Sequence, residues 1–166
     1  MWSDEFNGDS LNRADWNVET HEKGWVNNEL QEYVDSAENI QVKDGKLIIN
    51  PVKKVTDGDT GSTKEAASYT SGRVSTQNKQ TFIYGRFECR AKVPKGQGYL
   101  PAFWLMANDE NVYGQWPRCG EIDCMEVMGQ ETNKAYGTLH YGNPHSQSQG
   151  TYTITDGADF SDDFHI

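Results

Sequence analysis

Cysteine is scarce in this 166-residue chain, and the few cysteines form no recognisable framework. Cys89, Cys119 and Cys124 are odd in number and make no CxxC or CxxxC pair. A disulfide scaffold and a zinc knuckle are therefore unsupported. We expect the three side chains to be small residues of the core.

Positive charge and long apolar runs are scarce as well. The chain has 15 Lys and Arg against 25 Asp and Glu, a net charge of −10. Like charge opposes binding to nucleic acid or to an anionic membrane, so we expect neither partner. No apolar run approaches the roughly 18 residues of a membrane span. The chain also opens without the charged and apolar regions of a signal peptide, and its GxG at 96–98 lacks the rest of a dinucleotide-binding motif.

Helical periodicity is missing too, because no segment holds an apolar stripe at i, i+3, i+4 and i+7. Apolar residues alternate instead, most clearly from Ile83 to Val93, which predicts a long strand with one apolar and one charged face. An Asp-Gly pair at 44–45, between 39–43 and 46–49, predicts a hairpin. Further strands are predicted at 16–20, 28–34, 69–76, 101–106, 119–128, 135–141 and 151–155.

Many short strands with Gly and Asn turns indicate an all-β fold, a β-sandwich or jelly roll. The polar stretch from Lys53 to Ala67 predicts a surface loop rather than a linker, so we expect residues 1–166 to form one domain. The chain ends on DDFHI at 162–166, which is typical of the start of another strand. We therefore expect this domain to lack its C-terminal strands.

The most informative segment is a carboxylate cluster at 120–129, GEIDCMEVMG. Glu121 and Asp123 share a strand face, whereas Glu126 would point to the opposite face of a regular strand. One bulge residue near Cys124-Met125 would bring all three carboxylates to one side. Carboxylates in an apolar strand are costly unless they are paired or functional. The cluster therefore predicts a bulged strand at a functional site.

Two carboxylates about 5–5.5 Å apart suit glycoside hydrolysis with retention. One attacks the anomeric carbon, and the other, protonated, donates a proton to the leaving oxygen. A third carboxylate between them can orient the nucleophile and help to keep the acid protonated. Two other interpretations stay open from the residues alone, because such a pattern also arises by chance and because clustered carboxylates suit calcium, a hard cation.

The surrounding residues resemble glycoside hydrolase family 16, specifically its laminarinase-like, endo-β-1,3-glucanase branch. The matching segments follow the family's order from near residue 4 to the end of the chain. They are WVNNELQEY at 25–33, ENIQVKDGKLII at 38–49, YTSGRVST at 69–76, YGRFECRAKVPKGQG at 84–98, LPAFWLM at 100–106, WPRCGEIDCMEVMG at 116–129 and GTLHYG at 137–142.

This resemblance implies a jelly roll of two antiparallel sheets whose concave face forms an open polysaccharide cleft. It implies Glu121 as nucleophile, Glu126 as acid/base and Asp123 as the assisting carboxylate, in the bulged E-x-D-x-x-E form rather than the E-x-D-x-E form of the lichenases. By position it also implies further cleft residues. The sugar-stacking positions are Trp104 and Trp116, and the polar positions are Asn28, Glu29, Arg73 and His140.

The chain departs from the family at two points. Leu100 stands where members usually carry a Trp, which puts the shape of one sugar subsite in doubt. The family's catalytic domain also continues past DFH at 163–165, so a complementary C-terminal segment or chain is an expected partner. The resemblance further leaves room for a structural calcium ion, with Glu5 and Gly45 as candidate contributors.

We therefore expect an endo-acting retaining hydrolase of β-1,3-glucan (laminarin) or mixed-linkage β-1,3/1,4-glucan. The chemistry needs no cofactor, because two carboxylates suffice, and a polymeric substrate implies a secreted or extracellular protein. The net negative charge disfavours sulfated galactans, whereas a neutral glucan meets no repulsion. The alternatives are a noncatalytic β-glucan-binding module on the same fold and a calcium site in a lectin-like sandwich. Substitution of Glu121 separates an enzyme from a binder.

Overall fold

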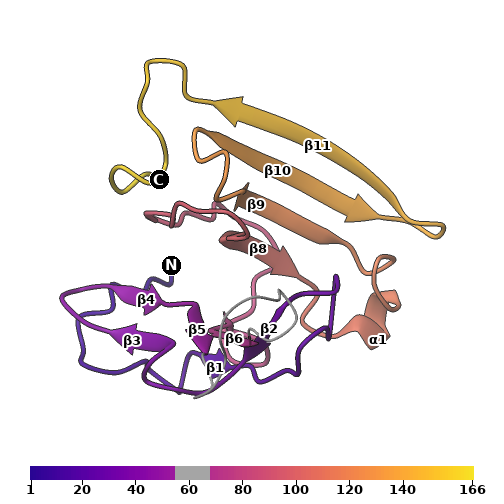
Figure 1. Cartoon of the computed structure of the whole chain (residues 1–166). Helices are drawn as coiled ribbons and strands as arrows, with labels where there is room; N and C mark the ends of the chain where they lie inside the picture. Colours follow the sequence, from indigo (N-terminus) through magenta and orange to yellow (C-terminus); the bar gives the residue numbers. More distant parts are fainter. Residues whose placement is uncertain (55–67) are drawn as a thin grey trace. The chain divides into compact units, whose positions relative to one another are not determined.

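Short β-strands dominate the computed structural model of the chain (Figure 1). The structure describes residues 1–54 and 68–166, and the chain divides into two units, Met1–Phe82 and Ile83–Ile166. Within the described residues the one helix, α1 (Glu110–Tyr113), has four residues. No helix in that part of the chain is long and apolar enough to span a membrane. The predicted all-β class is confirmed.

The described part of the first unit contains three small sheets. Its strands are β1 (Asn17–Val18), β2 (Gln31–Tyr33), β3 (Ile40–Val42), β4 (Leu47–Ile49), β5 (Val52–Lys54), β6 (Ser68–Ser71) and β7 (Val74–Ser75). β1 pairs with β7 and β3 with β4, both antiparallel. β6 lies between an antiparallel β5 and a parallel β2. The parallel pair departs from the antiparallel sheets expected, and the long stretch of chain between β2 and β6 is what permits it.

The predicted hairpin at 39–49 is confirmed as β3 and β4. Its two central residues, Asp44 and Gly45, have φ of 53° and 69°. Positive φ at both positions is the requirement of a type I′ turn, whose twist matches that of the strands, and Asp-Gly meets it. Lys43 and Lys46 exchange two backbone hydrogen bonds of 2.9 and 3.1 Å across the turn.

The second unit contains one four-stranded antiparallel sheet in the order β11-β10-β9-β8 (Figure 1). Its strands are β8 (Ala102–Met106), β9 (Glu121–Val127), β10 (Lys134–Tyr141) and β11 (Ser146–Thr153). The predictions for β8, β9 and β10 are confirmed to within two residues. β11 begins five residues before the predicted 151–155, because its first half, SQSQG, carries no apolar alternation and is exposed throughout. An edge strand can hold this composition, since only one of its sides is paired.

The prediction of a long strand from Ile83 to Val93 is wrong. Only Ala91 pairs, in an isolated bridge with His165 whose two hydrogen bonds are 2.8 Å long. From Phe87 onward the side chains still alternate between less and more exposed, and Val93 is buried. Alternation indicates an extended backbone with two faces, but a strand also needs a hydrogen-bonded neighbour, which the alternation does not report.

The predicted strand at 69–76 is divided at Gly72 into β6 and β7. A Cβ atom at Gly72 would lie 2.5 Å from Cγ1 of Ile40 and 3.1 Å from the carbonyl oxygen of Asn39. The start of β3 therefore passes too close for any side chain at this position. Asn39 is almost fully buried and donates to the carbonyl oxygen of Asn50 and to Oγ1 of Thr70, which ties the hairpin to β6.

The other strand limits in the first unit are also narrower than the sequence predicts. The predictions at 16–20 and 28–34 contract to the two and three residues of β1 and β2. The loop predicted from Lys53 to Ala67 is wrong at its start, because Lys53 and Lys54 belong to β5 and pair with Tyr69 and Ser68. The rest of that loop, at 55–67, lies outside the described residues.

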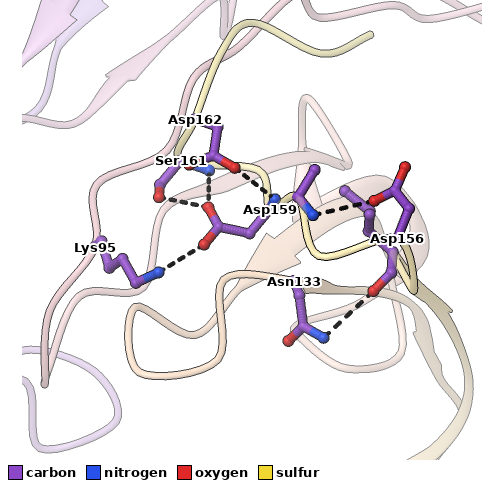
Figure 2. A network of polar contacts seen from close by, with 8 residues as sticks. Lys95, Asn133, Asp156, Asp159, Ser161 and Asp162 are labelled. Atoms are coloured by element: carbon purple, nitrogen blue, oxygen red, sulfur yellow. Dashed lines mark hydrogen bonds and ion pairs between the residues drawn. The ribbon is translucent and has the colours of Figure 1, made fainter.

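After β11 the chain returns to the start of β10 through a polar network (Figure 2). The Asp159 carboxylate accepts hydrogen bonds from Nζ of Lys95, at 2.6 Å, and from the backbone N–H and hydroxyl of Ser161. The backbone N–H of Phe160 donates to the carbonyl oxygen of Thr132 at 2.8 Å. Hydrogen bonding to Lys95, with a further contribution from Ser161, holds the pKa of Asp159 well below its usual range.

Replacement of Asp159 by Asn is therefore expected to lower the melting temperature at pH 7. Because the folded-state pKa of Asp159 is depressed, its carboxylate stabilises the fold fully at pH values above 3.8, the usual pKa of Asp. That stabilisation is lost as the pH falls through the folded-state pKa. The difference from the unmodified protein should thus shrink below about pH 4. Thermal melts from pH 3 to 8 measure it, with the exposed Asp163→Asn as control. A difference that does not change with pH would contradict the expectation.

Candidate active site

β9 carries the predicted β-bulge in the middle of the carboxylate cluster. Its ladder with β10 pairs Asp123 with Thr138 and Glu126 with Tyr136. The two β9 residues between those carboxylates therefore oppose a single residue, Gly137. Without the extra residue, Glu126 would face away from Asp123, since side chains alternate along a regular strand. The bulge puts Glu121, Asp123 and Glu126 on one face of β9.

The extra residue of the bulge is Cys124, which has no partner on β8, where Phe103 pairs with Met125 and Trp104 with Asp123. Its side chain is exposed, so the prediction of a core residue is wrong here. Cys89 and Cys119 are half-buried. All three are free thiols. Burial raises the pKa of Cys89 and of Cys119, and partial desolvation with the nearby charge of Asp123 raises that of Cys124.

Asp123 is the most buried of the three carboxylates, with a relative exposure of 5%. Burial, with the negative charges of Glu121 and Glu126, raises the pKa of Asp123 to about 6. A hydrogen bond to Glu121 acts in the same direction, and the charge of His140 opposes it. Asp123 therefore interacts with both neighbouring carboxylates, and it keeps its proton to a higher pH than an ordinary Asp does.

His140, on β10 opposite Glu121, is a basic side chain in contact with this group. Its Nε2 lies 3.2 Å from Oδ2 of Asp123, within ion-pair distance. The same oxygen is buried and receives no aligned hydrogen bond from the described residues. The distance and the missing alignment together indicate an electrostatic contact rather than a hydrogen bond.

Trp116 holds the carboxylate of Glu121. Its indole N–H donates to Oε2 of Glu121 at 2.6 Å. Its backbone N–H donates to Oε2 of Glu110, in α1, at 3.0 Å, which ties Trp116 to that helix. The ring is 44% exposed and lies 6.0 Å from the His140 ring, centre to centre. Trp104, the other predicted stacking residue, lies on β8 opposite Asp123.

Glu126 is contacted from β10 by Thr138, which is itself held from β11. The hydroxyl of Thr138 lies 3.5 Å from Oε2 of Glu126, at the outer limit of a hydrogen bond. Thr138 in turn accepts from the side-chain amide of Gln149 at 3.0 Å. The Glu126 carboxylate is thus held more loosely than that of Glu121.

The three remaining predicted residues lie in the first unit. Arg73 donates through Nε to Oε2 of Glu19 at 2.6 Å, and its guanidinium lies 5.0 Å from the centre of the Trp25 ring. Glu29 accepts from the side-chain amide of Gln31 at 3.0 Å. Asn28 is exposed and has a φ of 53°, in the left-handed region. The substrate-binding roles of these residues stay predictions.

Comparison with known proteins identifies the family. A family model described as "Beta-porphyranase A-D, GH16 domain" matches residues 1–165. The chain belongs to glycoside hydrolase family 16.

Three relatives illustrate how similar this family 16 chain is to proteins already described. It is 40% identical over 179 residues to glucan endo-1,3-beta-glucosidase A1 of Niallia circulans, covering 100% of this chain and 26% of that protein. It is 44% identical over 168 residues to the glucan endo-1,3-beta-glucosidase of Cryptopygus antarcticus, and this match covers 99% of this chain and 59% of that protein. The crystal structure of the laminarinase catalytic domain from Thermotoga maritima is similar, with a TM-score of 0.85 and 38% identity. This match covers 99% of this chain and 66% of that one.

This similarity confirms the predicted laminarinase-like jelly-roll fold. The family 16 chain nevertheless spans only about a quarter and three fifths of the lengths of the two curated glucanases.

Sequence reasoning missed several residues that contact the predicted ones. Within the first unit, Glu19 pairs with Arg73, and His21 stacks on Trp25 with ring centres 3.5 Å apart. Beside the carboxylates, Thr138 and Gln149 support Glu126, and His145 contacts His140. None lies in an unusual pattern. The one available signal for His145 is its position five residues after His140, on the turn that leaves β10.

The described residues contain no group of three or more His, Cys, Asp or Glu side chains arranged to hold a metal ion. The backbone oxygen of Glu5 does lie next to Gly45, 4.0 Å from where a Cβ atom would stand. A structural calcium ion in this family 16 chain stays a prediction.

Proposed function

We propose that this chain is the catalytic part of an endo-acting retaining β-glucanase, which cleaves β-1,3 or β-1,4 bonds of β-1,3-glucan or mixed-linkage β-1,3/1,4-glucan. The observation that carries the proposal is the bulge of β9, which gives Glu121, Asp123 and Glu126 a common face. Retaining hydrolysis needs two carboxyl groups on opposite sides of one glycosidic bond. A strand with such a bulge supplies both from a single rigid element.

In the proposed reaction Glu121 attacks the anomeric carbon, and the glycosidic bond breaks as Glu126 donates its proton to the leaving oxygen. Water then attacks the glycosyl-enzyme ester, with Glu126 taking the proton of that water. The indole N–H of Trp116 keeps Glu121 in position for the attack. The looser support of Glu126 suits a group that has to exchange protons in both steps.

Asp123 is proposed as the assisting carboxylate. Its pKa, raised to about 6 by burial and by Glu121 and Glu126, allows it to share a proton with Glu121 before substrate binds. Asp123 keeps the shared proton while Glu121 attacks as a carboxylate, and its O–H then orients the attacking side chain.

β-Glucan as substrate is supported by the relatives, because both curated glucanases and the laminarinase structure are named for it. The charge of −10 supports a neutral polymer over a sulfated galactan. Trp104 and Trp116 are proposed as sugar-stacking residues, and Asn28, Glu29, Arg73 and His140 as polar contacts. A polymeric substrate places the protein outside the cell, and the two-carboxylate reaction needs no cofactor.

The test is the release of reducing ends from laminarin, mixed-linkage β-glucan, a β-1,4-glucan and porphyran, the last as a sulfated galactan. We expect release from one or both of the first two and none from porphyran. Long oligosaccharides early in the reaction indicate endo cleavage, and β-anomeric ends first seen by proton NMR indicate retention. Binding of laminarin by a folded protein without any release would favour the noncatalytic glucan-binding module instead.

A further inference from the structure

Two histidines, His140 and His145, contact each other beside the carboxylate face. The proposed function gives a role to His140 and none to His145. Nδ1 of His140 lies 2.9 Å from Nε2 of His145, a hydrogen-bond distance. The other nitrogen of His140, Nε2, is the one that lies 3.2 Å from Asp123. The chain of contacts therefore runs from His145 through His140 to the buried carboxylate.

The ring of His145 also contacts the residue that holds Glu121. Its centre lies 5.1 Å from that of Trp116 and 5.2 Å from that of His140. His145 stands on the turn between β10 and β11, just before the pair of Tyr141 with Ser146 that closes the ladder. A single exposed side chain thus touches the partners of two of the three carboxylates.

We infer that His145 is a positioning residue, whose imidazole holds His140 with Nε2 within ion-pair distance of Asp123 and in the tautomer that carries its hydrogen on Nε2. The inference rests on the proposed function for its kinetic consequence, but the contact itself is independent of hydrolysis.

Proton placement explains why this position suits a histidine. When Asp123 is ionised, Nε2 of His140 has to carry a hydrogen, because a lone pair there would face a carboxylate. Nδ1 of a neutral His140 is then an acceptor, and Nε2–H of His145 donates to it. When His140 takes up a second proton, Nδ1–H donates instead, and His145 accepts after moving its own hydrogen to Nδ1. Imidazole serves in both states.

The side chains that surround His140 are acidic or uncharged, apart from His145. β9 presents Asp123, Glu121 and Glu126, which are acidic, and β11 presents the uncharged Gln147 opposite His140. The Trp116 ring, also uncharged, lies on the side of the loop before β9. Among these neighbours, His145 lies at hydrogen-bond distance from Nδ1, at 2.9 Å.

The experiment compares His145→Phe, which keeps a ring against Trp116 but has no nitrogen, with His145→Gln, whose amide can donate or accept. Ser146→Ala, at the next residue and the first of β11, is the matched control. In each variant the ¹⁵N resonances of the His140 imidazole and the titration of the Asp123 carboxyl are followed by NMR, alongside kcat and KM on laminarin. Thermal melts confirm that each variant folds.

In His145→Phe we expect the His140 nitrogen resonances to shift and the Asp123 midpoint to move to higher pH, because a less well-oriented His140 lowers the pKa of Asp123 less. We expect kcat to fall on the order of tenfold with KM changed by less than about twofold. His145→Gln should show little of either change, because its amide can still form the hydrogen bond to His140. Ser146→Ala should match the unmodified protein.

Unchanged His140 resonances and an unchanged Asp123 midpoint in His145→Phe would overturn the inference. Equal effects of Phe and Gln would overturn it too, since the ring and not the hydrogen bond would then be responsible. A protein that hydrolyses none of the polysaccharides would count against the proposed function alone, because the NMR comparison still decides the role of His145.

Discussion

Glu121→Gln is expected to lower kcat on laminarin by at least about 1,000-fold, because an amide cannot form the glycosyl-enzyme ester. Gln keeps the size of the side chain, and its amide oxygen can still accept the indole N–H of Trp116, which is 2.6 Å from Oε2 of Glu121. The fold should therefore persist. Reducing-end release measures the loss, with the exposed Glu88→Gln as matched control and a thermal melt of each protein.

The nucleophile and the acid/base can be separated by azide. With an activated glycoside, Glu121→Ala in azide should give the α-glycosyl azide, because azide replaces the nucleophile on its own face. Glu126→Ala should give the β-glycosyl azide, since azide then attacks the enzyme-bound ester. The opposite pairing of products would mean that the two roles are exchanged. Activity of Glu121→Gln close to that of Glu88→Gln would contradict the whole assignment.

Gly129→Ala is expected to destabilise the fold by about 3 kcal/mol, or roughly 10 °C in melting temperature. Gly129 follows β9 and is bound on both sides: its N–H donates to Tyr99 and its carbonyl accepts from Gly96, both at 2.8 Å. A Cβ atom there would lie 2.3 Å from the carbonyl oxygen of Gly96 and 2.8 Å from Cβ of Tyr99. Because one of these is backbone, the segment would have to move and lose both hydrogen bonds.

The matched control is Gly150→Ala on β11, where nothing lies within 4 Å of the added Cβ. Its expected effect is within about 0.5 kcal/mol. Urea unfolding of both variants gives the free energies, with unchanged m-values required for the comparison. Equal stabilities of the two variants would show that the loop at 96–99 yields freely to the end of β9.

Local features of the chain could be predicted from the sequence because their causes are local. The hairpin follows from Asp44 and Gly45, which tolerate the positive φ of a type I′ turn. The bulge follows from parity once the three carboxylates are taken to act together, since residues spaced two and three apart reach one face only if a residue is inserted. No knowledge of neighbouring strands enters either argument.

Strand limits were predicted less well, since they depend on which backbone lies alongside. The segment 83–93 has the right alternation but only one bridge, at Ala91. β11 has a full partner in β10 and no alternation in its first half. Hydrogen-bonded neighbours are non-local, and side-chain patterns report burial rather than pairing.

The sequence by itself determined the family, through the resemblance of its motifs, and the all-β class, through the alternation of its residues. It also predicted that three carboxylates share one strand face, because strand parity is a property of the chain. Only the tertiary structure decided how those carboxylates differ. Burial raises the pKa of Asp123 to about 6, Trp116 holds Glu121, and Thr138 reaches Glu126. His145 enters only because β10 and β11 close on the turn that carries it. Dielectric surroundings and hydrogen-bond partners exist only once separate strands have come together.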